Sequence, residues 1–447
     1  MIGKKFRPFS NLKFENWKNL LLFAVFLFYF LLLISWIWKG NFLSDYGSDY
    51  LAFWSAGKIA DENGYSEIYD LNNLSSVQKQ ALLTQGNINN KSLPSYSPNP
   101  APVFSIFILP FQFLSRIDIR AGYWTWTIIN LAILIVYLVS FLNSILPGSE
   151  VITTNAKTIL LVLASFPVFS NIFQGQVQVF PLVCVGEFIR YALRKNLILS
   201  GVWLGGLLLK PQLLIIIIPL ILIMRNWKTL IGFIVSSGVV LITSFMLSGF
   251  AGINALINLW TKYSVGMATN APEFMINWRM IGLNLNHIFN TSFGWVITGV
   301  GMALTVYVVW VLIKFNPLYG SSQWVISMLG IFSATLIFTW HSHYHMALVL
   351  LPFFVFALIH KLVREEIVFF WVILTPTVLF GVKCFSLIYS LLTKTYFIHE
   401  WELIGFSGFI VNVVLLISTL RYFMTCDILE NKIQEEIAVS SETQQVK

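Results

Sequence analysis

The chain has 447 residues, of which 57% are hydrophobic and 11% are charged, and its formal net charge is +8. Soluble globular domains carry about 25% charged residues, so this composition excludes an ordinary soluble protein. The basic residues gather in short loops, which membrane topology explains better than a nucleic-acid partner does. Three scattered cysteines, Cys184, Cys384 and Cys426, predict neither a disulfide framework nor a metal site.

Apolar runs long enough to cross about 30 Å of hydrocarbon recur along the chain. The first, Leu20–Trp38, is too long for the apolar part of a cleaved signal peptide and is predicted to be a retained span. Further spans are expected at 121–143, 157–173, 177–194, 229–249, 293–313, 322–340, 344–360, 366–386 and 404–423.

The stretch 197–224 contains Lys210-Pro211-Gln212 near its middle. A single helix would bury Lys210 at the centre of the bilayer, which is costly. Basic residues flank both ends of the stretch, so the positive-inside rule places both ends in the cytoplasm. Two short helices that meet at Lys210 satisfy both constraints and bring the prediction to about twelve spans.

The apolar segment 101–114 is too short for a span and is expected to be an interfacial or re-entrant helix on the outer side. This choice keeps the N-terminus and the later basic loops inside. The predicted fold is therefore all-α, a polytopic helical bundle over residues 1–424. An outer loop at 39–120 carries juxtamembrane helices, and a polar cytoplasmic tail covers 425–447.

With this topology, polar residues from at least five segments fall at the outer membrane boundary. Ionisable groups at membrane depth usually serve function, so their convergence predicts a site. The set comprises Asp45, Asp49, Lys58, Gln174, Gln176, Lys210, Gln212, Asn277, Arg279, His341, His343 and His345.

Asp49 stands near the start of segment 47–58, which is interpreted as an amphipathic helix on the outer surface. Two roles are open for it. Ser48 or Asp49 can cap the helix N-terminus, or Asp49 can act as a general base that takes a proton from an acceptor hydroxyl. Asp45, four residues upstream, is the rival carboxylate.

The run Trp340-His341-Ser342-His343-Tyr344-His345 holds half of the histidines in the chain. If the run is helical, alternate side chains point in different directions, and no group of carboxylates accompanies them in sequence. We therefore expect no metal site and no cofactor. Binding of a phosphate by one of these histidines is the more plausible role, with Lys210 and Arg279 as companions.

Several strings in the chain resemble glycosyltransferase family 87 in order and spacing, over roughly residues 20–360. They are Asp49-Tyr50, Phe53-Trp54, Ala56-Gly57-Lys58, Gly64, Ile68-Tyr69-Asp70, Tyr96-Ser97-Pro98, Pro100-Ala101-Pro102, Gly175-Gln176, Gly201, Gly205 and Leu209-Lys210-Pro211-Gln212. The segment that is usually rich in Pro-Pro is here Pro98-Asn99-Pro100-Ala101-Pro102.

The resemblance implies the GT-C architecture and an integral-membrane transferase that uses a polyprenyl-phosphate sugar, often mannose. It implies that Asp49 is the base and that a late histidine, His341, His343 or His345, helps to bind the donor phosphate. The further residues expected to bind substrate or donor phosphate are Lys58, Tyr96, Gln176, Lys210 and Arg279. The expected partners are this donor, a glycolipid or glycan acceptor and the bilayer, with the site on the extracytoplasmic side of the plasma or inner membrane. The alternatives are a multispan transporter or lipid flippase, or a scaffold without catalytic activity.

Overall fold

A computed structural model describes residues 10–39, 42–43, 46–85, 96–145, 158–263, 272–395 and 399–445. Within these ranges the regular structure is helical, and the one β feature is an isolated bridge between Phe42 and Tyr46. The predicted all-α class is confirmed.

In the part of the chain that the structure describes, six helices are long and apolar enough to cross a membrane, so the chain is a multi-pass membrane protein. The outward faces of these helices expose Leu, Ile, Val and Phe side chains, as a lipid environment requires. The predicted number of about twelve spans is not confirmed. The six helices are α1 (Ser10–Lys39), α5 (Ile119–Ile145), α11 (Trp227–Asn258), α13 (Phe293–Lys314), α16 (Glu365–Thr393) and α17 (Glu400–Gln445).

Shorter helices occupy the remaining predicted spans. The stretch 197–224 is divided at Lys210, as predicted, because Pro211 lacks an N–H and restricts the backbone of the residue before it. The short elements are α7 (Phe166–Gln174), α8 (Val179–Leu193), α9 (Leu197–Gly205), η4 (Gly206–Leu209), η5 (Pro211–Leu214), α10 (Ile217–Ile223), α12 (Trp278–Phe289), α14 (Ser322–Phe338), η9 (Tyr344–Leu350) and α15 (Leu351–Ile359).

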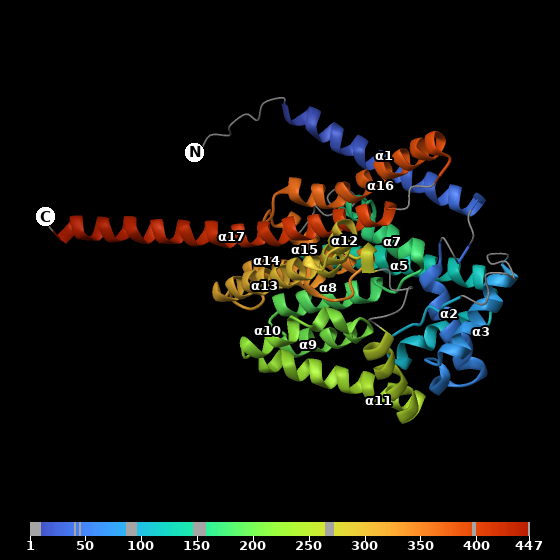
Figure 1. Ribbon diagram of the computed structural model, residues 1–447. Coiled ribbons are helices and arrows are strands. Elements are labelled where there is room, and N and C mark those ends of the chain that lie inside the picture. The colour runs from blue at the N-terminus through green and yellow to red at the C-terminus, as the bar shows by residue number, and fades with distance from the viewer. Residues whose placement is uncertain are drawn as a thin grey trace.

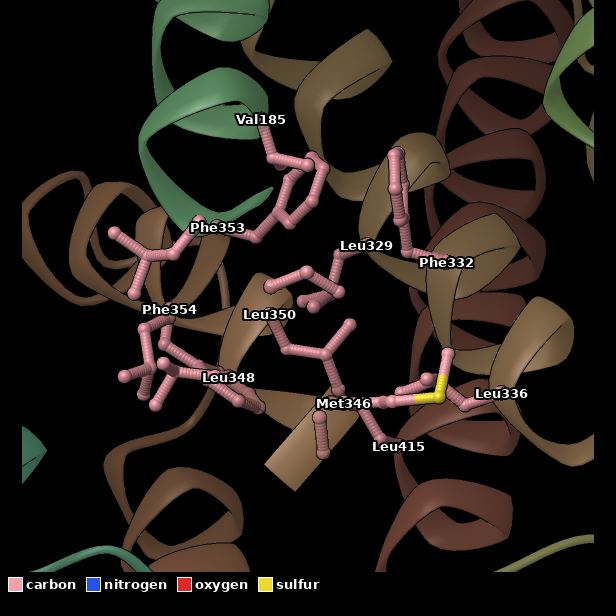
Figure 2. Close-up of a cluster of buried hydrophobic side chains, with 14 of the residues drawn as sticks. Val185, Leu329, Phe332, Leu336, Met346, Leu348, Leu350, Phe353, Phe354 and Leu415 are labelled. Atoms are coloured by element: carbon pink, nitrogen blue, oxygen red, sulfur yellow. The ribbon is translucent and has the colours of Figure 1, made fainter. Parts of the chain in front are cut away.

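The core of the bundle forms around α14, whose side chains from Trp324 to Ile337 are all buried. A helix that is apolar on every face is stable only when other helices surround it. Figure 2 shows side chains of α8, η9, α15 and α17 meeting those of α14. The labelled residues are Val185, Leu329, Phe332, Leu336, Met346, Leu348, Leu350, Phe353, Phe354 and Leu415.

The segment between α1 and α5 forms the predicted juxtamembrane helices: α2 (Ser48–Glu62), η1 (Tyr65–Glu67), α3 (Leu71–Thr84), η3 (Ser105–Ile108) and α4 (Leu109–Leu114). In Figure 1, α2 and α3 lie together at one end of the molecule, whereas the C-terminal part of α17 projects from the opposite side. The position of 47–58 at the outer surface of the membrane stays a prediction, but within the protein this segment is not exposed. Most residues of α2 are buried, because α3, α4, α5 and α7 pack around it.

Two contacts fix α2 against α4. Arg116 donates to the Asp61 carboxylate from both Nε and Nη2, at 3.2 and 2.6 Å from Oδ1. Gly57 lets the two backbones approach so closely that a Cβ there would lie 2.3 Å from the carbonyl of Phe111. The absence of a side chain at Gly57 therefore sets the position of the helix that carries Asp49.

Replacement of Gly57 by Ala is expected to destabilise the protein by about 1–3 kcal/mol, because the backbone of α4 must move away. Thermal unfolding of the purified protein in detergent measures this loss. Gly238→Ala is the matched control, since a Cβ at Gly238 meets no atom within 4 Å. An unchanged melting temperature for Gly57→Ala would show that α2 and α4 can separate without cost.

Helix α17 continues to Gln445 without a break at 424 or 425. The secondary structure therefore does not change at the predicted boundary between the membrane domain and the tail. The assignment of 425–447 to a cytoplasmic tail stays a prediction.

Candidate active site

A cavity of about 580 Å³ opens beside the N-terminal end of α2. Its walls come from α2, the segment 99–102, the end of α7 and the turn after it, the η4–η5 break, Leu259 and Trp260 directly after α11, the connection from α14 to η9, and the start of α17. We call it the Asp49 cavity. Residues far apart in sequence meet here, as the predicted convergence of polar groups requires.

The Asp49 carboxylate is held by two amide groups. Gln176 Nε2 donates to Oδ2 at 2.7 Å, and Asn99 Nδ2 donates to Oδ1 at 3.4 Å. The alternative capping role is wrong, because the N-cap of α2 is Gly47 and no side chain caps that helix end. Asp49 instead faces the cavity, where each oxygen keeps a lone pair for a further donor.

Lys210 is the basic residue of the cavity that is best placed to bind a ligand. It lies at the break between η4 and η5 and lines the cavity with its neighbours Pro211 and Gln212. Among the described residues, no carboxylate makes an ion pair with it. Burial lowers the pKa of the Lys210 ammonium, while Asp49 acts in the opposite direction. An ammonium in this position is suited to bind an anion.

The three late histidines all line the same cavity, so the expectation that they point in different directions is wrong. Helix α14 ends at Phe338, and the backbone is extended at Thr339 and His343. Side chains two residues apart share one side of an extended backbone. The ring centroids of His341 and His343 are 4.9 Å apart, and those of His343 and His345 are 5.7 Å apart.

Two of these histidines have a defined electrostatic state or partner. Burial, opposed by Asp49 and reinforced by Lys210, lowers the pKa of His343 to about 4, which favours the neutral ring at pH 7. His345 Nδ1 lies 2.8 Å from Gln174 Oε1. An amide oxygen only accepts, so His345 carries its proton on Nδ1 in this arrangement.

Three predicted site residues do not line the cavity. Lys58 pairs with Glu62 at 3.4 Å and lies over the Trp54 ring. Tyr96 donates to Gln78 Oε1 behind the cavity wall. Arg279 is 6% exposed and stacks on Trp340 with its guanidinium carbon 4.7 Å from the ring centroid. Arg279 thus acts on the cavity through Trp340. Burial lowers the pKa of His341, and the charge of Arg279 is a smaller contribution in the same direction.

Other residues fall outside the prediction or the described ranges. The rival carboxylate Asp45 lies outside the described residues. Asn99 and Trp401 line the cavity but were not predicted as site residues. Gln174, which also lines the cavity, belongs to the set predicted at the outer membrane boundary, but no role is predicted for it. The sequence does offer a sign that Asn99 is a site residue, because its side chain is a single amide among several prolines.

The fold and the cavity together define a multi-pass membrane protein in which one pocket holds the Asp49 carboxylate and the Lys210 ammonium. The family model of glycosyltransferase family 87 matches residues 101–339, more than half of the chain. The chain therefore belongs to glycosyltransferase family 87 and is a membrane glycosyltransferase. No curated protein matches it. The matched range contains Gln176, Lys210 and Arg279, whereas Asp49 and the three histidines lie outside it.

Proposed function

We propose that the protein transfers mannose from a polyprenyl-phosphate donor to a glycolipid or glycan acceptor on the outer face of the cell membrane. The observation that carries this proposal is the presence of Asp49 and Lys210 in one cavity. A carboxylate can accept the proton of a sugar hydroxyl, and an unpaired ammonium can bind a phosphate. Together the two groups supply a base and a phosphate-binding cation for sugar transfer from a phosphate.

In the proposed reaction Asp49 takes the proton of the acceptor hydroxyl while the oxygen of that hydroxyl attacks the anomeric carbon of the donor sugar. The bond from that carbon to the phosphate oxygen breaks, and the electron pair leaves on the lipid phosphate. Lys210 and a cavity histidine stabilise the developing charge, and Arg279 adds a positive charge behind Trp340. Attack from the side opposite the phosphate inverts the anomeric centre. A lipid phosphate is a good leaving group, so the reaction needs neither a nucleotide nor a metal.

The distribution of basic loops supports the proposed orientation in the membrane. Lys195 and Arg225 flank the two short helices at the ends away from Lys210, and the positive-inside rule assigns those ends to the cytoplasm. The Lys210 break then lies on the extracytoplasmic side, together with Asp49. A lipid donor placed between helices would present its sugar to the cavity there.

The test is the transfer of radiolabel from polyprenyl-phosphate-[¹⁴C]mannose to a lipid or glycan fraction by membranes that contain the protein. Label in the product fraction is expected. Parallel assays with polyprenyl-phosphate glucose and arabinose decide the sugar. If no carrier sugar is transferred, but labelled lipid crosses the bilayer of reconstituted vesicles, the protein is a flippase and the proposed function is wrong.

A further inference from the structure

We propose that Gln78 and Asn99 are positioning residues that orient the Asp49 carboxylate, an inference that rests on the proposed role of Asp49 as the base. Gln78 lies on α3 and is fully buried. It does not line the cavity, and Asn99 stands between it and Asp49. The side chains of Gln78 and Asn99 connect the juxtamembrane helix α3 to the Asp49 carboxylate, the proposed base.

All of the hydrogen-bonding capacity of the Gln78 side chain is used. Its Nε2 donates to the Asn99 carbonyl at 2.7 Å and to Ser55 Oγ at 2.9 Å. Its Oε1 accepts from the Asn99 N–H and from Tyr96 OH, both at 2.8 Å. A buried amide with four satisfied bonds has one orientation, because any rotation leaves polar atoms without partners.

The sequence around Asn99 explains why Gln78 binds at this point. Asn99 stands between Pro98 and Pro100, and prolines have no backbone N–H. Of the three residues Pro98, Asn99 and Pro100, Asn99 is therefore the one that can donate from its backbone. Gln78 binds both the N–H and the carbonyl of that residue, which fixes the direction of the Asn99 side chain.

The Asn99 side chain then extends to α2. Its Nδ2 lies 3.4 Å from Asp49 Oδ1 and 3.4 Å from the carbonyl oxygen of Ser48. Gln176 binds the other carboxylate oxygen at 2.7 Å. Two donors on different oxygens prevent rotation of the carboxylate, so the free lone pairs keep a constant direction towards the cavity.

Gln78 also binds the helix that carries Asp49. Ser55 lies on α2, one and a half turns after Asp49, and its hydroxyl accepts from Gln78. The segment 96–99 and helix α2 are thus attached to the same side chain. Movement of one relative to the other would break a bond of Gln78, so the distance between Asn99 and Asp49 is held from both sides.

The first experiment replaces Asn99 by Ala, which removes the donor to Asp49 and keeps the backbone contacts to Gln78. We expect kcat for sugar transfer to fall roughly tenfold, the value of one hydrogen bond, while KM for donor and acceptor stays within twofold. Asn99→Gln, which retains an amide, should recover part of the loss. Unchanged kcat, or a rise in acceptor KM alone, would overturn the positioning role of Asn99.

The second experiment tests whether Gln78 acts through Asn99. Gln78→Leu should lower kcat roughly tenfold or more, whereas Gln80→Leu, an exposed position on the same helix, should leave kcat unchanged. In the Asn99→Ala background, Gln78→Leu should have little further effect on kcat. Full additivity of the two losses would show that Gln78 serves only to stabilise the fold. If Asp49→Asn keeps full activity, the proposed function fails instead, and the two failures are distinguishable.

Discussion

Replacement of Asp49 by Asn is expected to abolish sugar transfer, with a loss of about 10³-fold in kcat. Asn has nearly the same shape as Asp, so the cavity and α2 should keep their structure. Its side-chain amide lacks the basic oxygen that takes the hydroxyl proton. Lys210 and the histidines are untouched, so donor binding should persist.

The measurement is single-turnover transfer of labelled sugar, with binding of labelled donor followed separately. Asp70→Asn is the matched control, because Asp70 caps α3 outside the cavity and Asn is an equally good cap. Asp45→Asn tests the rival carboxylate. Full activity of Asp49→Asn would remove Asp49 from the mechanism, and loss of activity in Asp45→Asn alone would transfer the role to Asp45.

Features that depend on hydrophobicity and charge along the chain were predictable from the sequence. The break at Lys210 is one of them, because a lysine followed by proline cannot stay in the middle of an apolar helix without great cost. The meeting of Asp49, Gln176 and Lys210 is another. The predicted topology puts all three residues at the same membrane boundary, which is the reason why the sequence predicts that they lie on one face.

Features that depend on local backbone geometry were not predictable in this way. The histidines converge because α14 ends at Phe338 and the following residues are extended. Nothing in the apolar run up to 340 marks that end. Asp49 resembled a cap because it stands near a helix start, yet the contacts of its carboxylate come from Asn99 and Gln176, distant in sequence.

The role of Gln78 was predictable from the sequence only in part. Leu74, Gln78, Ala81 and Leu82 are the buried residues of α3, and their spacing is that of one helix face. A single amide within such an apolar stripe is a signal that a buried polar partner exists. The sequence does not show that the partner is the backbone of Asn99, because this contact joins segments that only the packing of α2, α3 and residues 96–99 brings together.

Replacement of Lys210 by Met is expected to separate activity from stability. Met has a similar length but no charge, so the phosphate loses its ammonium, and kcat should fall roughly 10²-fold with a higher KM for the donor. The Lys210 side chain is half-buried and has no ion-pair partner among the described residues. Burial lowers the pKa of the ammonium and so disfavours its charged form. Its removal should therefore leave the melting temperature unchanged or raise it.

The experiment measures transfer rate, donor KM and thermal unfolding of Lys210→Met beside Lys228→Met, an exposed lysine near the start of α11. Lys210→Arg keeps the charge and should retain more activity than Lys210→Met, although a planar guanidinium does not place its donors as an ammonium does. Loss of both activity and stability in Lys210→Met would mean that Lys210 serves the fold. Full activity with Met would mean that the donor phosphate is bound elsewhere. A fall in activity without a fall in stability is the combination expected of a cation that the protein retains at the η4–η5 break for its ligand.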